Sequence, residues 1–278
     1  MVAARLALTH RIGRFLGHYL DGNFIGPRSE LPEGTASVRV RRYRELGQGI
    51  DSEQLTIKIA ANYVSDRKVD LAAPQVEIRG LISDRLLVHH KLIEIDRSQY
   101  DLRKVKERPF FSPISLHPRY ARAVVNMTGA KAGDRVLDPF CGTGGLLIEA
   151  AMLGMKVYGS DLSPEMIEGC AQNLEHFGLK ADRLEAIDVG KAAEVFGEVD
   201  GVASDPPYGR STSTNREALD SLYSRSLVVM AQTVRADGRL CMVFPRDVVI
   251  PENLVLEERH DQRVHRSLSR YYMVLRRR

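Results

Sequence analysis

Four consecutive residues, Asp205-Pro206-Pro207-Tyr208, combine side chains and backbone in a way that can orient an amine. Two successive prolines fix two φ angles and remove two amide donors, so the chain turns sharply with the Pro206 carbonyl free to accept. The Asp205 carboxylate and that carbonyl can together accept both hydrogens of an aromatic amino group. The Tyr208 ring can stack on the aromatic base that carries this group. We predict these four residues as catalytic; the alternative is a tight structural turn.

An aromatic amino group is a poor nucleophile because its lone pair is delocalised into the ring. Acceptors that take its hydrogens favour a geometry ready for attack. In-line placement against a methyl sulfonium then supplies most of the rate. Such a reaction needs no metal and no covalent intermediate.

A glycine-rich loop precedes this motif, in the segment Asp138-Pro-Phe-Cys-Gly-Thr-Gly-Gly145. Gly142 and Gly144 allow a tight turn and the close approach of a ligand, and the amides at the start of the next helix suit a carboxylate or phosphate. Asp138, at a strand tip, can bind an ammonium group. The loop is not a full G-x-G-x-x-G pattern and no G-K-[ST] follows, so a structural turn and a dinucleotide site both stay open.

Two further aspartates follow predicted strands. Asp161 stands where doubly wound folds place an acidic residue for ribose hydroxyls. It is also a candidate helix N-cap, although Ser163 before Pro164 can supply that cap instead. Asp188 can accept from an adenine amino group, or it is an aspartate of a surface loop.

Strands and helices alternate from Asp134 onward, which is typical of an α/β fold with a mainly parallel sheet covered on both faces. Ligands of such sheets bind beyond the carboxyl ends of the strands. We predict strands at residues 135–137, 156–159, 184–187, 201–204, 239–244 and 271–275. We predict helices at residues 119–127, after the glycine-rich loop to about 153, at 164–177 and at 218–235.

The first hundred residues predict a small α+β unit. Residues 36–42 alternate apolar and basic side chains, as a half-buried strand does. Residues 75–81 and 86–94 predict two more strands, and 55–62 a strand or a short helix. An amphipathic helix is expected before them, with a transit-type segment as the alternative. The apolar face of that helix would consist of Leu8, Ile12, Phe15, Leu16 and Tyr19.

The formal net charge of +4 is uneven. Residues 1–113 hold 19 Lys and Arg against 14 Asp and Glu, whereas the remainder holds 21 against 22. A basic front end suggests a module that binds a polyanion, and the alternative is a solvated surface. The predicted phosphate contacts are Arg39, Arg41, Arg42 and Arg44.

No apolar run reaches the length of about 18 residues that a membrane-spanning helix needs. The three cysteines lack metal-type spacing and a disulfide framework. A reducing, cytoplasmic compartment is therefore the simplest expectation.

The four motifs, in this order, resemble those of the Rossmann-like class I methyltransferases, and Asp-Pro-Pro-Tyr is similar to the motif of the amino-methyltransferases. The segment from Arg108 to Asn126 (RPFFSPISLHPRYARAVVN), joined to the glycine-rich loop, resembles the THUMP-containing tRNA (guanine-N2-)methyltransferases. Within them the likeness is to the archaeal type, which acts on guanosine at position ten. It runs from about Thr35 to the C-terminus.

The resemblance implies a THUMP-like RNA-binding domain at 1–100 with a reduced N-terminal segment, a linker at 101–118 and a methyltransferase domain at 119–278. It implies tRNA as the substrate and S-adenosyl-L-methionine as the cofactor. Asp205 and Pro206 would orient guanine N2, with Tyr208 on the base. Phe111, Pro113 and Pro118 would help to close the cofactor pocket. The residues implied to bind the cofactor are Asp138, Phe140, Gly142, Gly144, Asp161, Leu162, Asp188, Val189, Leu116 and His117.

His117 is expected to pack or to position the backbone rather than to act as a base. The resemblance leaves open one methyl or two, and an activating protein subunit. Two other functions stay open: a DNA amino-methyltransferase, for which no insertion is large enough to be a target-recognition domain, and a non-catalytic RNA-binding protein. The intact Asp138, Asp161 and Asp205 argue against the latter.

Overall fold

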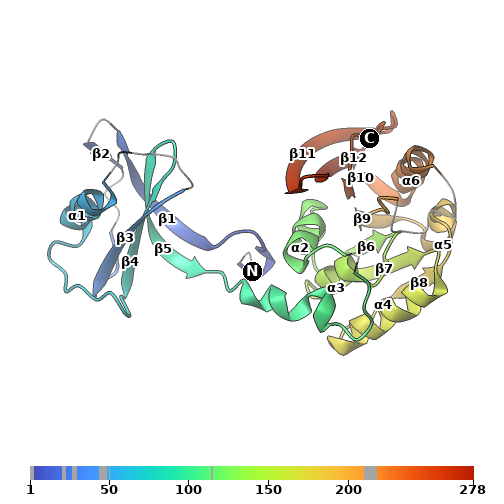
Figure 1. Ribbon diagram of the computed structural model, residues 1–278, viewed down its shortest axis with the longest axis horizontal. Coiled ribbons are helices and arrows are strands. Elements are labelled where there is room, and N and C mark those ends of the chain that lie inside the picture. Colours follow the sequence, from blue (N-terminus) through green and yellow to red (C-terminus); the bar gives the residue numbers. More distant parts are fainter. Residues whose placement is uncertain are drawn as a thin grey trace. The chain divides into compact units, whose positions relative to one another are not determined.

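The computed structural model describes residues 3–20, 23–26, 30–43, 49, 51–113, 115–209 and 218–278. The chain divides into two compact units (Figure 1). Thr9–Asp96 form the small unit, while Met1–Leu8 and Arg97–Arg278 form the large unit. The boundary thus falls just before residue 97 rather than at 100. Residues 101–118, expected as a linker, belong to the large unit.

The described part of the small unit is a five-stranded sheet with one long helix. Its strand order is β2-β1-β5-β4-β3, with β3 parallel to β4 and the other neighbours antiparallel. The elements are β1 (Arg11–Leu20), β2 (Asn23–Ile25), β3 (Ala36–Arg42), α1 (Ser52–Tyr63), β4 (Val76–Ile82) and β5 (Leu86–Glu94). The predicted strands at 36–42, 75–81 and 86–94 are confirmed. The segment at 55–62 is helical, with Asp51 as the N-cap that accepts from the amides of Glu53 and Gln54.

The helix expected near the N-terminus is wrong, because Arg11–Leu20 is a strand. The strand pairs with β2 and with β5, which lies more than sixty residues later in the chain. Leu16 is fully buried in the core of the small unit, while Leu8 and Phe15 are each 50% exposed. Pairing with a distant strand therefore overrides a local helical pattern, as tertiary context often does.

The described part of the large unit contains a seven-stranded sheet with the order β11-β12-β10-β9-β6-β7-β8. Strands β10, β9, β6, β7 and β8 run parallel, while β12 is antiparallel to β10 and β11 is antiparallel to β12. The strands are β6 (Arg135–Asp138), β7 (Lys156–Asp161), β8 (Arg183–Ala186), β9 (Val199–Ser204), β10 (Val234–Phe244), β11 (Leu254–His265) and β12 (Leu268–Arg277). The helices are α2 (Pro118–Met127), α3 (Gly145–Ala151), α4 (Pro164–His176), α5 (Ala192–Phe196) and α6 (Leu219–Thr233).

Helices cover both faces of this sheet, as predicted (Figure 1). Alternate strand residues enter different cores: Val136 packs with α2, α3 and α4, whereas Leu137 packs with α5 and α6. Among the α-helices and strands described for the large unit, two were not predicted, the short α5 and the strand β11. Most residues of β11 are exposed, so its sequence lacks the apolar alternation that signals a strand. Among the described residues, no helix is long and apolar enough to cross a membrane.

Candidate active site

The predicted aspartates gather at one edge of the large sheet. Strand β6 ends at Asp138, β7 ends at Asp161, and Asp205 directly follows β9. Because β9, β6 and β7 are adjacent and parallel, their carboxyl ends meet. A pocket of about 1270 Å³ opens there. Its lining includes Pro113, Phe140, Gly142, Asp161, Leu162, Asp188, Val189, Asp205, Pro206, Pro207, Tyr208, Arg225 and Arg270.

Asp138 is buried beneath the glycine-rich loop, with 1% of its surface exposed. Its Oδ1 accepts from Ser204 Oγ at 2.6 Å and from the amide of Phe140 at 3.1 Å. Burial raises the pKa of Asp138 to about 7, against the lowering effect of these two bonds. A buried carboxylate of this kind gains from a cationic partner.

Asp161 fixes the shape of the glycine-rich loop. Its Oδ2 accepts from the amide of Gly142 at 3.1 Å, and its Oδ1 from the amide of Ser163 at 3.0 Å. Ser163 caps α4 through the amide of Met166, as predicted. Gly144 has φ of +82°, and a Cβ there would lie 2.7 Å from the sulfur of Cys170. Only glycine fits this position without strain.

Asp188 is bound by Arg225 of α6, which also lines the pocket. Both Nη atoms of Arg225 donate to the two carboxylate oxygens, with Nη2 to Oδ2 at 3.1 Å. The amide of Gly190 also donates to Oδ1, at 2.7 Å. The hydrogen bond from Arg225 is the largest cause that lowers the pKa of Asp188. Asp188 is therefore a charged, structurally engaged carboxylate at the rim.

Asp205 takes part in a chain of polar groups. The hydroxyl of Tyr208 donates to Asp205 Oδ1, and Nε of Arg270 donates to the Tyr208 oxygen at 3.3 Å. The guanidinium carbon of Arg270 lies 5.8 Å from the centre of the Tyr208 ring. Burial raises the pKa of Asp205 to about 6, although the Tyr208 bond and the Arg270 charge lower it. The hydroxyl of Tyr223 holds the turn through the Pro207 carbonyl at 2.6 Å.

A family model described as an RMKL-like methyltransferase domain matches residues 106–272. The chain belongs to this family. It is 37% identical to a tRNA (guanine(10)-N2)-dimethyltransferase of Methanothermobacter thermautotrophicus, over 98% of this chain and 84% of that protein. A protein of the same name from Pyrococcus abyssi is 36% identical, with the same coverage. The crystal structure of TrmN from Thermus thermophilus shares the fold, with a TM-score of 0.56 and 23% identity over 88% of this chain and 73% of that chain.

Of the remaining residues that the family resemblance implied, some lie at the pocket and others shape its walls. Phe140, Leu162 and Val189 line the main pocket, and Leu116 lines a smaller cavity beside it. Gly144 is the N-cap of α3. His117 is the N-cap of α2, since its Nδ1 accepts from the amide of Arg119 at 3.2 Å. That contact is a backbone-positioning one.

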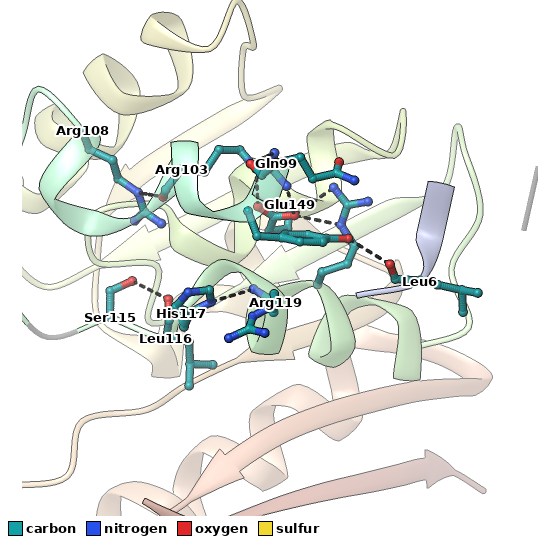
Figure 2. A network of polar contacts seen from close by, with 11 residues as sticks. Leu6, Gln99, Arg103, Arg108, Ser115, Leu116, His117, Arg119 and Glu149 are labelled. Carbon is teal, nitrogen blue, oxygen red and sulfur yellow. Dashed lines mark hydrogen bonds and ion pairs between the residues drawn. The ribbon is translucent and has the colours of Figure 1, made fainter. Parts of the chain in front are cut away.

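From the segment before α2, the main pocket is lined by Ser112, Pro113 and Ser115. Phe111 is 61% exposed, and neither it nor Pro118 is among the lining residues of the two cavities. The residues before α2 are joined to helix α3 through the side chains of Arg103 and Glu149 (Figure 2). Glu149 Oε1 binds Arg103 Nε at 2.7 Å, and Oε2 binds Arg122 Nη2 at 2.8 Å.

The predicted phosphate contacts lie on the small unit, apart from Arg44, which lies outside the described residues. Arg39, Arg41 and Arg42 are exposed on β3. Arg39 Nη2 donates to the carbonyl of Leu71 at 2.6 Å. Arg79 of β4 pairs in register with Arg39. Burial, followed by the charges of Arg11, Arg39 and Arg41, lowers the pKa of Arg79, so several cations share this region.

Among the site residues that the sequence analysis did not single out are Arg225, Arg270 and Ser115. Arg225 and Arg270 come from α6 and β12, far along the chain from their partners Asp188 and Tyr208. Neither lies in a motif, so only the folded chain brings them to the pocket. Ser115 lines the pocket and lies within the segment that carries the family resemblance. Its place in that segment was the one signal that the sequence offered.

Proposed function

We propose that this chain transfers methyl groups from S-adenosyl-L-methionine to the N2 amine of a guanosine in tRNA, at position ten. The observation that carries the proposal is the half-buried Asp205 carboxylate with its Tyr208 partner at the sheet edge of a methyltransferase-family chain. The relatives at 36–37% identity, which match 98% of the chain, are named for this reaction on this nucleotide.

The pocket residues fit the cofactor. Gly142 and Gly144, both with positive φ, form a loop that leaves room for a ligand close to the backbone. Asp161 would hold the ribose hydroxyls, and Asp188 with Val189 the adenine edge. Asp138 would hold the ammonium group of the methionine part. When bound, the cofactor supplies an electrophilic methyl group on a sulfonium.

The chain's own residues position the amine. Asp205 and the Pro206 carbonyl would accept the two N–H groups of guanine N2, with Tyr208 stacked on the base. In the structure the Tyr208 hydroxyl occupies Asp205 Oδ1, so the substrate amine would replace that donor. At neutral pH a carboxyl with a pKa of about 6 is largely ionised and accepts hydrogen bonds. The raised pKa also suits Asp205 to receive the proton that the methylated amine loses.

The small unit would bind the tRNA backbone. Arg39, Arg41 and Arg42 are exposed and can meet phosphates, which gives affinity that depends on salt but not on sequence. This role would make the small unit, Thr9–Asp96, an RNA-binding domain of the THUMP type. A guanosine inside a stem is out of reach of the pocket, so it would be flipped out of the helix. A tRNA substrate and three free, buried cysteines suit a cytoplasmic enzyme.

Methyl transfer from labelled S-adenosylmethionine to unmodified bulk tRNA, followed by nucleoside analysis, tests the proposal. We expect label in N2-methylguanosine or its dimethyl form, and the ratio of the two gives the number of methyls. Label in another nucleoside would overturn the choice of base. Label in DNA or protein instead of tRNA would overturn the choice of substrate.

A further inference from the structure

One buried cation of the large unit has a donor that nothing in the described chain satisfies. Arg108 is 5% exposed, and its Nε donates to the carbonyl of Arg103 at 3.0 Å. Its Nη1 is fully buried and has no hydrogen-bond partner among the described residues. A buried guanidinium donor left unpaired costs free energy, so its retention calls for an explanation.

The charges around Arg108 do not balance. Figure 2 shows Arg108 in a network with Arg103 and Glu149, and Arg122 joins the same carboxylate. The network thus sets three guanidinium groups against one carboxylate, both of whose oxygens are taken by Arg103 and Arg122. Burial lowers the pKa of Arg108, while the charge of Glu149 raises it. An additional anion would restore the balance.

The unpaired donor lies beside the glycine-rich loop. A Cβ on Gly145 would lie 3.4 Å from Arg108 Nη1 and 2.7 Å from Ser115 Oγ. Both side chains therefore approach the same glycine. Gly145, Ser115 and Asp138 line the smaller cavity, whose volume of about 50 Å³ suits a small polar group. That cavity shares Phe140, Gly142 and Asp205 with the main pocket.

We propose that Arg108, with Ser115 Oγ as a second donor, binds the carboxylate of the cofactor's methionine part. The inference rests on the proposed function, since it takes S-adenosyl-L-methionine as the ligand. An amino acid carries a carboxylate and an ammonium group on one carbon. Asp138 lines the smaller cavity, and the Arg108 guanidinium lies beside Gly145, which lines the same cavity, so the two opposite charges lie near one another. A guanidinium binds a carboxylate through charge-assisted hydrogen bonds.

Two ligands separate this role from a structural one. S-adenosylhomocysteine carries the amino-acid part, whereas 5′-methylthioadenosine keeps the adenosine and the sulfur but lacks that part. The affinity of each is measured by calorimetry on wild type and Arg108→Gln. We expect Arg108→Gln to weaken S-adenosylhomocysteine about 10- to 100-fold, the range for a hydrogen bond to a charged group. Its affinity for 5′-methylthioadenosine should stay within about three-fold of wild type.

Arg122→Gln is the matched control, because it removes a buried guanidinium that binds the same carboxylate but is not among the nearest neighbours of Gly145. It should lower the melting temperature and leave the ratio of the two affinities unchanged. If Arg108→Gln does not fold, a crystal structure of wild type with S-adenosylhomocysteine decides. Nη1 within about 3.2 Å of the carboxylate supports the assignment, and a carboxylate bound elsewhere overturns it.

The outcomes also separate this inference from the proposed function. Equal losses for both ligands, or no loss in Arg108→Gln, would overturn the assignment of Arg108 while wild-type binding still upholds the cofactor. Wild type that binds neither ligand would overturn both proposals.

Discussion

The carboxylates of the pocket fall into two groups whose pKa values are shifted in opposite directions. On one side, Asp138 is buried and Asp205 is half-buried, and loss of hydration raises their pKa values to about 7 and about 6. On the other side, Asp188 is 38% exposed and held by Arg225, which lowers its pKa. The first pair is costly to ionise without a ligand, whereas the second is already satisfied by the protein. Unfavourable burial therefore marks the part of the pocket where the chemistry is expected.

The largest expected effect comes from removing Asp205. Asp205→Ala deletes the carboxylate that would accept from the amine, so methyl transfer should fall about 100- to 1000-fold or more. Affinity for S-adenosylhomocysteine should change little, since Asp205 is assigned to the base rather than to the cofactor. The measurement pairs single-turnover methyl transfer with calorimetry. Unchanged turnover would remove Asp205 from the mechanism.

Asp138→Asn should affect the stability of the fold and the affinity for S-adenosylhomocysteine in opposite directions. The folded pKa of about 7 lies above the ordinary 3.8, so the folded chain holds a proton that the unfolded chain has released. This group therefore lowers the free energy of unfolding as pH rises from about 4 to about 7, and the penalty persists above pH 7. Asparagine keeps Oδ1 as an acceptor for Ser204 and Phe140 but carries no charge.

Asp138→Asn should consequently melt several degrees higher than wild type near pH 8, with a smaller gain near pH 5. Its affinity for S-adenosylhomocysteine should weaken about ten-fold or more, because the ammonium group loses its partner. Thermal melts at both pH values and calorimetry measure these effects. A lower melting temperature of Asp138→Asn at pH 8 would mean that the buried Asp138 carboxylate does not destabilise the fold.

Arg270 tests how the Asp205 carboxylate is tuned. Its positive charge lowers the pKa of Asp205, so Arg270→Ala should raise that pKa. The acid limb of kcat/KM should then move to higher pH by about one unit. Arg270→Lys keeps the positive charge and should leave the acid limb of kcat/KM near its wild-type pH. If both variants shift the limb equally, the charge of Arg270 is not what tunes Asp205.

Asp188→Asn should change the free energy of unfolding least, and it should lower it where Asp138→Asn raises it. Because Arg225 lowers the pKa of Asp188, the pair stabilises the fold above the ordinary pKa of the carboxyl and loses that contribution as pH falls through the lowered value. The side chain is partly exposed and screened by solvent, so the loss near pH 7 should be about 0.2–1 kcal/mol. Denaturant unfolding at pH 7 and near pH 3 measures it. A stabilised Asp188→Asn at pH 7 would break the contrast between the two groups of carboxylates.

The sequence predicts this pocket well where a motif directly follows a strand. Asp138 and Asp161 end β6 and β7, and Asp205 follows β9. Their positions could be predicted because local apolar runs and turn residues indicate where those strands end. Arg225 and Arg270 could not be predicted, since their role depends on the packing of α6 and β12 against motifs elsewhere. The strand β1 was missed for the same reason: its partner β5 is remote in sequence.

The most direct test of the account uses two tRNA transcripts that differ only at nucleotide ten. One carries guanosine there, and the other carries inosine, which lacks only the N2 amine. We predict label from S-adenosylmethionine in N2-methylated guanosine of the first transcript, and none in the second although it binds comparably. Equal label in both transcripts would contradict the claim that Asp205 orients the amine of this guanosine.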